Sequence, residues 1–161
     1  MPPTDAQLEA GNYRKGHTRF AGLAITIENP VGSTRSGVDR GGKRWSTRMK
    51  CSYGYFKGSL GVDGDHLDCY LGPDEAADTV YLVNTMAPPN FTKPDEQKVM
   101  LGFNSEEAAR RAFLLHYDNP RFLGSITAMP LERFKRELRT TRERPRMLKA
   151  LVLFFRPAPA S

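Results

Sequence analysis

Three aspartates lie within six residues, at Asp63, Asp65 and Asp68. Carboxylates are rarely buried without a partner, and three this close repel one another unless a cation lies between them. Because all three side chains offer only oxygen, the pattern indicates a hard cation, Mg2+ first and Mn2+ or Ca2+ next. The alternative is a solvated acidic turn, in which Gly61 and Gly64 serve only the shape of the backbone.

Zinc is a further alternative for the same stretch. Cys51 and Cys69 are the only two cysteines, and His66 lies between them. A zinc site would need a fourth ligand that the sequence does not supply, and the neighbouring carboxylates favour a harder ion. Neither cysteine belongs to a C-x-x-C pair, so we expect two free thiols in a reducing compartment.

The residues before the aspartates resemble those of a known family. Tyr53-Gly54-Tyr55 is followed, eight residues on, by Asp63-Gly64-Asp65-x-x-Asp68. This arrangement resembles the signature of the soluble family I inorganic pyrophosphatases, in which a tyrosine pair precedes an aspartate triad at this spacing. His66 departs from it, since that family usually has proline or glutamate there. The stretch GNYRKGHTRFAGLAITIENPVGSTRSG resembles the divergent branch found in bacteriophage and mobile-element proteins.

The resemblance implies metal-dependent hydrolysis of a phosphoanhydride, most simply inorganic pyrophosphate to two phosphates, with Mg2+ or Mn2+ as cofactor. It implies that Asp63 and Asp68 bind metal, and that Asp65 binds metal and is the base that activates water. Clustered carboxylates that hold metal ions suit such chemistry, because a metal-bound water loses its proton more readily.

A later acid and lysine also resemble a pair in the family. Glu96 precedes Lys98 by two residues, as an aspartate precedes a lysine there, and Asp95 is the alternative acid. Tyr53 and Tyr117 resemble tyrosines that contact phosphate, the second within LLHYDN. Asp118 departs from the family's lysine, and no aspartate lies five residues before Glu96.

Further residues complete the predicted site. Glu28 and Arg35 resemble the family's early glutamate and phosphate-binding arginine in type and order, and Arg121 is a candidate to replace the missing lysine. The predicted catalytic residues are Asp65, Lys98 and Tyr53; the predicted phosphate-binding residues are Arg35, Lys43, Lys50, Tyr117 and Arg121; the predicted metal ligands are Asp63, Asp65, Asp68, Glu96 and Glu28.

The overall charge favours an anionic partner. Lysine and arginine outnumber the acids 24 to 18, a net charge of +6, which suits a small phosphate substrate or nucleic acid. The alternative function is therefore a non-catalytic OB-like module that binds nucleic acid, or a phage structural module that kept the fold. Tyr53, Tyr55 and Phe56 with Lys50 and Lys57 would suit a single strand. Three carboxylates in the groove would repel its phosphates unless metal is present.

Length and composition predict one compact domain, at 161 residues with 39% hydrophobic and 26% charged residues. We expect a flexible arm over 1–16, a pyrophosphatase-like domain over 17–140, and a basic, then apolar, tail over 141–161, which fits a final strand or a contact in a homo-oligomer. No apolar run approaches the roughly 20 residues of a membrane span. No membrane partner is expected, and the predicted location is the cytoplasm, or a virion if the chain is phage-encoded.

Periodicity predicts the main elements. Residues 23–27 alternate as a strand, 31–50 form a basic hairpin with Trp45 in the core, and 80–86 and 98–103 are strands. The last strand places Glu96, Lys98 and Met100 on the face opposite Val99, Leu101 and Phe103. Helices are expected from an Asn104-Ser105 cap to about Tyr117, and from Pro130 with a stripe of Leu131, Phe134 and Leu138.

These elements predict an α+β fold that is mainly β. The two forms considered are a small OB-like five-stranded barrel, which the resemblance implies, and a curled antiparallel sheet, each with two or three helices packed outside.

Overall fold

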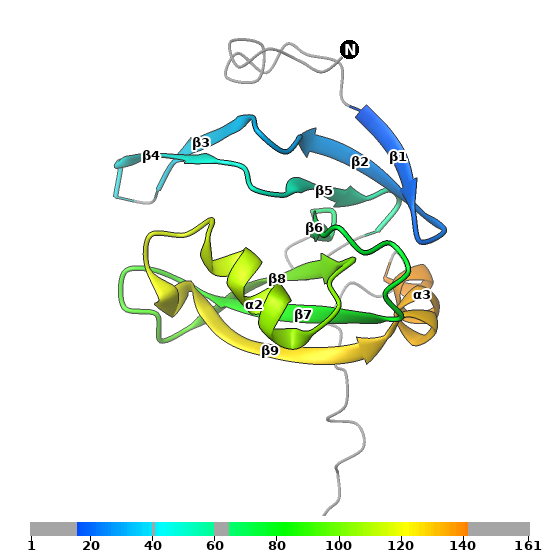
Figure 1. Cartoon of the computed structure of the whole chain (residues 1–161). Helices are drawn as coiled ribbons and strands as arrows, with labels where there is room; N and C mark the ends of the chain where they lie inside the picture. The colour runs from blue at the N-terminus through cyan, green and yellow to red at the C-terminus, as the bar shows by residue number, and fades with distance from the viewer. Residues whose placement is uncertain (1–15, 40, 60–64, 142–161) are drawn as a thin grey trace, which may run out of the picture.

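The computed structural model describes residues 16–39, 41–59 and 65–141, which form one curled seven-stranded sheet, a separate two-stranded sheet and two α-helices (Figure 1). The predicted class, α+β and mainly β, is confirmed. The elements are β1 (Gly16–Phe20), β2 (Leu23–Asn29), β3 (Thr34–Val38), β4 (Arg44–Arg48), β5 (Ser52–Phe56), β6 (Asp68–Leu71), β7 (Thr79–Met86), β8 (Pro94–Leu101), α2 (Glu106–Leu114), the 3-10 turn η1 (Pro120–Phe122), β9 (Leu123–Pro130) and α3 (Leu131–Thr140).

The large sheet has the strand order β1-β2-β5-β6-β8-β7-β9. Its strands pair antiparallel except for β6 and β8, which are parallel. Of the two forms expected, the curled sheet is therefore correct, but it is mixed rather than purely antiparallel. Within the part of the chain that the structure describes, β1 and β9 remain edge strands and close no barrel.

The register of the central strands separates two faces. Tyr53 pairs with Tyr70 across β5 and β6, and Asp68 pairs with Lys98 across β6 and β8. Since paired residues share a face and neighbours along a strand alternate, these side chains lie on one face and Val99 on the other. The predicted division is confirmed for Val99 and Leu101 against Lys98 and Met100. It is wrong for Phe103, because the strand ends at Leu101 and Phe103 packs in the same core as Met100.

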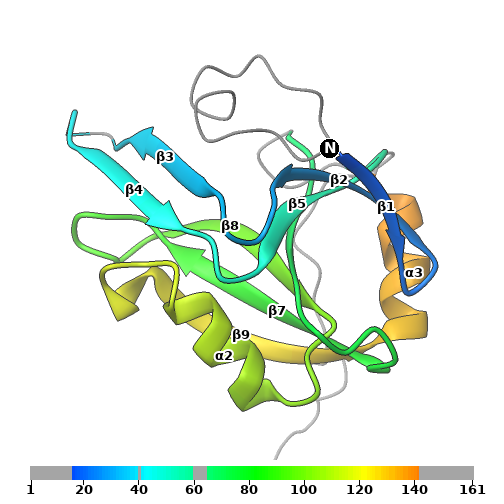
Figure 2. The same cartoon turned by 45° about the horizontal axis from the view of Figure 1, so that its top comes forward.

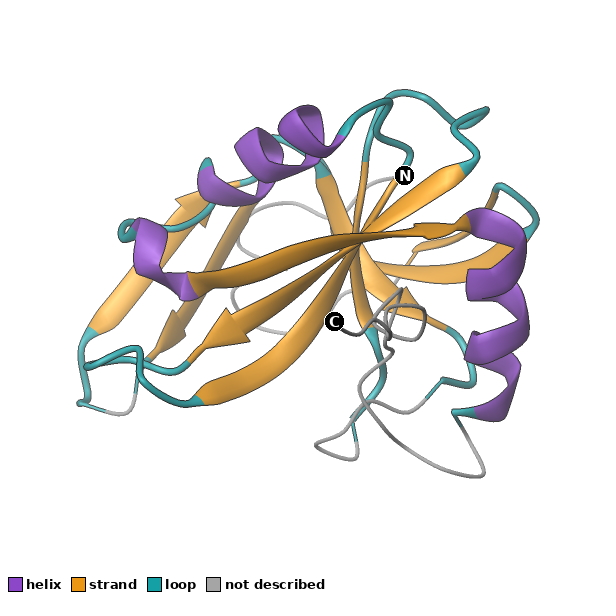
Figure 3. Cartoon of the chain, turned by 90° about the horizontal axis from the view of Figure 1, so that it is seen from below, coloured by secondary structure: helices purple, strands orange, loops and turns teal. Residues whose placement is uncertain are grey.

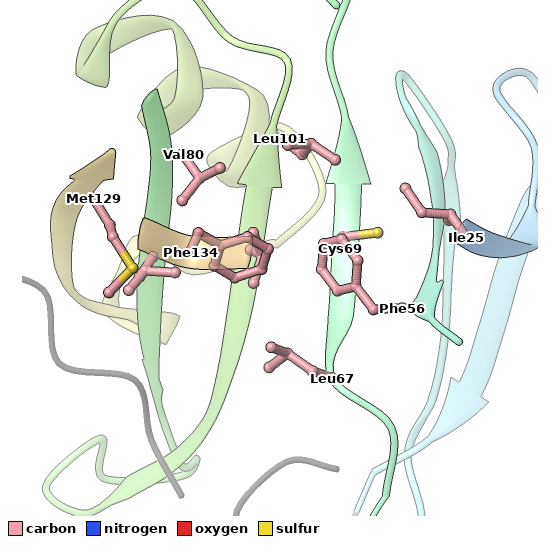
Figure 4. Close-up of a cluster of buried hydrophobic side chains, with 10 residues drawn as sticks. Ile25, Phe56, Leu67, Cys69, Val80, Leu101, Met129 and Phe134 are labelled. Atoms are coloured by element: carbon pink, nitrogen blue, oxygen red, sulfur yellow. The ribbon is translucent and has the colours of Figure 1, made fainter. Parts of the chain in front are cut away.

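Each face carries its own hydrophobic core. On the face of Val99, the apolar stripe of α3 packs as predicted. Phe134 is fully buried among the core side chains (Figure 4). The partly buried Leu131 and Leu138 pack against the same core. That core consists of Ile25, Phe56, Leu67, Cys69, Val80, Leu82, Val99, Leu101, Met129 and Phe134. The second core lies under α2, on the face of Lys98, so that the two helices cover different parts of the strands (Figure 3).

Helix α2 begins as predicted and ends early. The Ser105 side chain accepts a hydrogen bond from the Ala108 backbone N–H, which satisfies one of the free donors of the first turn. Glu106 and Glu107 follow in that turn, where the helix dipole favours acids. The α-helix ends at Leu114, three residues before the expected Tyr117.

The basic hairpin forms as β3 and β4, but Trp45 does not anchor it in the core. Because this hairpin is a sheet of its own, Trp45 is only half-buried and lies over Gly37, where an added Cβ would meet the indole at 2.6 Å. Met49, just after the hairpin, occupies the core instead and is 2% exposed.

The ends of the chain lie almost wholly outside the described residues. Of the predicted arm (1–16) and tail (141–161), only Gly16, in β1, and the buried Thr141 are described. The predicted final strand near residue 150 and the domain boundaries therefore stay predictions. None of the helices in the described ranges is long and apolar enough to cross a membrane.

Gly54, between the two tyrosines of β5, is predicted to be required for stability. An added Cβ would lie against the Thr26 carbonyl oxygen and the β2 backbone, which cannot move without disturbing the ladder. We expect Gly54→Ala to lower the free energy of unfolding by about 1–3 kcal/mol or more, measured by denaturant titration.

Gly41→Ala is the matched control, because its Cβ would meet only the Asp39 carboxylate at 3.5 Å. It should change the free energy of unfolding by less than about 0.5 kcal/mol. Equal unfolding midpoints for the two variants would contradict the steric account.

Candidate functional site

A buried ammonium group lies at the centre of the site. Lys98, 3% exposed, donates from Nζ to Tyr53 Oη at 2.6 Å, to Asp68 Oδ2 at 2.8 Å and to Glu96 Oε1 at 3.1 Å. Since a lysine ammonium has three N–H donors, these contacts use all of them. The Tyr53 hydroxyl in turn donates to Asp68 Oδ2 at 2.6 Å. Tyr53, Asp68 and Lys98 therefore form a closed triangle of hydrogen bonds.

The charges in this cluster support one another. Burial alone would lower the pKa of Lys98, but the oxygens of Tyr53, Asp68 and Glu96 outweigh it and raise that pKa well above its ordinary value. Burial also raises the pKa of the Tyr53 phenol, so the phenol stays neutral. The positive charge of Lys98 is therefore balanced by the two carboxylates, as a buried charge requires.

Arg35 of β3 lies over this cluster. Its guanidinium carbon is 4.3 Å from the centre of the Tyr53 ring and 5.2 Å from that of Trp45. Burial disfavours its charge, but Tyr53 and the Asp68 carboxylate are among the groups that raise its pKa. Among the described residues, no carboxylate pairs with the guanidinium, so its planar array of donors remains available to a ligand.

Tyrosines connect the cluster to the end of α2. The Tyr70 ring lies 4.8 Å from the Tyr53 ring, and Tyr117 is close enough to be among the groups that, after burial, raise the pKa of Tyr70. Tyr117 stacks on Phe113 of α2 at 4.4 Å between ring centres. The structure thus brings the predicted Tyr117 to the same place as Tyr53 and Arg35.

Other predicted phosphate-binding residues lie elsewhere. Arg121 donates to the Asn90 carbonyl at 2.8 Å and lies 5.0 Å from the centre of the Phe91 ring, so it is engaged with the loop between β7 and β8. Lys43 is exposed in the turn of the β3–β4 hairpin. Lys50 is exposed, next to His116. No described contact joins any of the three to Lys98 or Asp68.

The predicted metal ligands are only partly gathered. Asp68 and Glu96 meet at Lys98, with 22% and 34% of their side chains exposed. Asp65 is exposed and Glu28 half-buried, while Asp63 lies outside the described residues. Over the described ranges, no three acids, histidines or cysteines come together as a metal site. The roles assigned to these residues stay predictions.

The donor chemistry nevertheless fits a hard cation. Tyr53 and Lys98 both bind the same Asp68 oxygen, and no described residue forms a hydrogen bond to the other. Carboxylate oxygens are the ligands that Mg2+ prefers. Zinc is disfavoured, because burial raises the pKa of both Cys51 and Cys69 and so favours thiols over the thiolates that bind zinc.

Two site residues were missed in the sequence. Tyr70 is two residues after Asp68 in the same strand, so strand alternation places it on the site face and could have identified it. Trp45 lies beside Arg35 only because the hairpin pairs the two strands, and no local signal indicates this contact.

Comparison with known proteins gives a family match. The family model described as inorganic pyrophosphatase matches residues 5–139. Solved inorganic pyrophosphatases are also similar: that of Neisseria gonorrhoeae is 15% identical with a TM-score of 0.45, covering 88% of this chain and 95% of that one. That of Helicobacter pylori is 14% identical with a TM-score of 0.44, covering 82% and 97%. That of Coxiella burnetii is 16% identical with a TM-score of 0.39, covering 74% and 92%. No curated protein matches the chain.

Lys98→Met is predicted to destabilise the fold strongly. It leaves Asp68 and Glu96 without their cation, and breaking a buried ion pair costs about 3–5 kcal/mol of unfolding free energy. Because the pKa of Lys98 is raised in the fold, its contribution is complete below its ordinary value of 10.5 and is lost as the pH rises through the folded value. The difference in the free energy of unfolding between the wild type and Lys98→Met, measured by denaturant unfolding, should therefore decrease at alkaline pH.

Lys135→Met is the matched control, since its contact with Glu132 is 3.5 Å long and the glutamate side chain is 77% exposed. It should cost less than about 1 kcal/mol. An equal loss in both variants would show that Lys98 contributes no more than a surface lysine.

Proposed function

Because the chain belongs to the inorganic pyrophosphatase family, we propose that it hydrolyses inorganic pyrophosphate to two phosphates in a reaction that requires Mg2+. The observation that carries the proposal is the environment of Arg35. Its guanidinium lies over Tyr53 and Trp45 without a carboxylate partner among the described residues. A planar guanidinium held in this way matches the paired oxygens of a phosphate group.

The two cations of the site have different tasks. Arg35 binds phosphate oxygens through its guanidinium N–H groups, which no carboxylate of the described residues engages. Lys98 supplies a fixed positive charge close by, and its longest contact, 3.1 Å to the more exposed Glu96, is the one that a phosphate oxygen can replace. Such fixed charges stabilise the charge that develops on the leaving phosphate without further reorganisation.

The aspartates have the complementary task. Tyr53 and Lys98 orient Asp68 through one oxygen and leave the other for a cation. Asp65, exposed and three residues earlier, is the proposed base that takes a proton from water, and Asp63 is the proposed third ligand. When bound, Mg2+ supplies positive charge against the phosphate oxygens and lowers the pKa of a water molecule; Mn2+ can take its place.

The environment of the tyrosines argues against the nucleic-acid alternative. A stacking platform must expose the face of its ring to a base. Tyr53 is 2% exposed and covered by Arg35, and Tyr55 stacks on His66 with 4.2 Å between ring centres. Membership of the bacteriophage and mobile-element branch stays a prediction.

Arg35→Lys is predicted to lower kcat/KM for pyrophosphate by at least about tenfold, because an ammonium presents neither the planar donors nor the stacking surface. Arg121→Lys is the matched control, since its guanidinium is engaged with Asn90 and Phe91, and should stay within about twofold. The measurement is phosphate release with pyrophosphate and Mg2+.

Two results would contradict the proposal. Absence of phosphate release by the wild-type chain, with Mg2+ and with Mn2+, would show that pyrophosphate hydrolysis is not its function. Equal losses in the two arginine variants would show that the place of Arg35 over Tyr53 has no particular role.

A further inference from the structure

The hairpin that carries Arg35 is joined to the rest of the fold at its root. No backbone ladder links β3 and β4 to the seven-stranded sheet, and the hairpin projects beyond it (Figure 2). At the root, Gly32 N–H donates to the Met49 carbonyl and Met49 N–H donates to the Ser33 carbonyl, both at 2.8 Å. The position of Arg35 over the site therefore depends on what holds this root.

His116 holds the residue next to the root. Its imidazole Nε2 accepts the backbone N–H of Lys50 at 2.9 Å, and its Nδ1 lies 2.7 Å from the Ala112 carbonyl oxygen. Because a backbone N–H can only donate and a carbonyl can only accept, the ring must be neutral with its proton on Nδ1. At 6% exposure, both ring nitrogens are satisfied by the chain itself.

We propose that His116 is a positioning residue, which ties the hairpin bearing Arg35 to α2 and to Tyr117, three residues beyond the end of that helix. The Lys50 N–H is bonded to the His116 imidazole, which is bonded to the Ala112 carbonyl. Tyr117 directly follows His116 in the sequence. Its effect on turnover rests on the proposed function, whereas the tie itself does not. The His116 side chain thus sets the distance between Arg35 and Tyr117, the two proposed phosphate-binding residues.

The same geometry makes the tie sensitive to acid. A proton on Nε2 would point at the Lys50 N–H, so two donors would face each other and the bond would be lost. The groups that face the ring are Lys50 and Arg35 on the hairpin side, Tyr70 of β6 with 4.9 Å between ring centres, and the adjacent Tyr117. Burial lowers the pKa of His116. The hydrogen bond to the Ala112 carbonyl opposes this, but the Arg35 and Lys50 cations add to the effect of burial, and the pKa is lowered overall. The tie is therefore intact at neutral pH and opens as the pH falls through this lowered value.

The fluorescence of Trp45 tests the tie without any assay of activity. Trp45 is the only tryptophan and lies in the hairpin beside Arg35. Between about pH 8 and pH 5, the wild-type protein should show a fluorescence transition with its midpoint below the ordinary histidine value of about 6.5. His116→Gln should lack it, because the amide oxygen can accept the Lys50 N–H and does not titrate.

His66→Gln is the control, since His66 stacks on Tyr55, and it should retain the transition. A transition that persists in His116→Gln, or that is absent from the wild type, would overturn the proposal.

A double-mutant cycle tests the effect on the substrate. His116→Leu should raise KM for pyrophosphate roughly two- to tenfold, the equivalent of one hydrogen bond, and change KM less than about twofold in an Arg35→Ala background. If His116→Leu raises KM by the same factor in the wild type and in Arg35→Ala, His116 does not act through Arg35 and the proposed role is overturned. If His116→Leu does not fold, the pH profile replaces it. Because pyrophosphate itself takes up protons on acidification, the comparison is between proteins: KM of the wild type should rise more than KM of His116→Gln.

The two experiments separate this inference from the proposed function. A wild-type chain that releases no phosphate disproves the hydrolysis, and the Trp45 titration then decides alone whether His116 holds the hairpin.

Discussion

The buried ammonium of Lys98 is the interaction on which the site depends. A charge removed from water is costly unless oppositely charged partners surround it, and here Asp68, Glu96 and Tyr53 each provide an oxygen. The parallel pairing of β6 and β8 places Asp68 directly beside Lys98, while Glu96 follows from strand alternation within β8. The mixed sheet thus orients two carboxylates before any ligand is present.

The hydrophobic core fixes the register of β8 that places Lys98 beside Asp68. Val99 and Leu101 alternate with Lys98 and Met100 along β8, and all four are buried. A slip of β8 by one residue would turn Lys98 and Glu96 toward the core beneath α3 and bring Val99 beside Asp68. The energy that fixes the register comes from apolar burial on one face, and the polar site on the other face depends on that register.

The sequence predicted those features that depend on local spacing. The faces of β8, the Ser105 cap and the Phe134 stripe follow from periods that short stretches reveal. The parallel pairing of β6 with β8 and the half-buried state of Trp45 depend on how distant segments meet, which no short pattern reports. For the same reason, the sequence could not distinguish the two candidate phosphate-binding arginines. The structure places Arg35 over Tyr53 and Arg121 against Phe91.

We propose that Lys98 and Arg35 together bind one diphosphate next to the oriented Asp68. A crystal structure with Mn2+ and imidodiphosphate, an analogue that resists hydrolysis, tests it most directly. We expect an anomalous Mn2+ signal bonded to the Asp68 oxygen that Tyr53 and Lys98 do not contact, and phosphate oxygens within hydrogen-bond distance of the Arg35 guanidinium. Analogue and metal bound elsewhere, with Arg35 and Asp68 free of both, would contradict it.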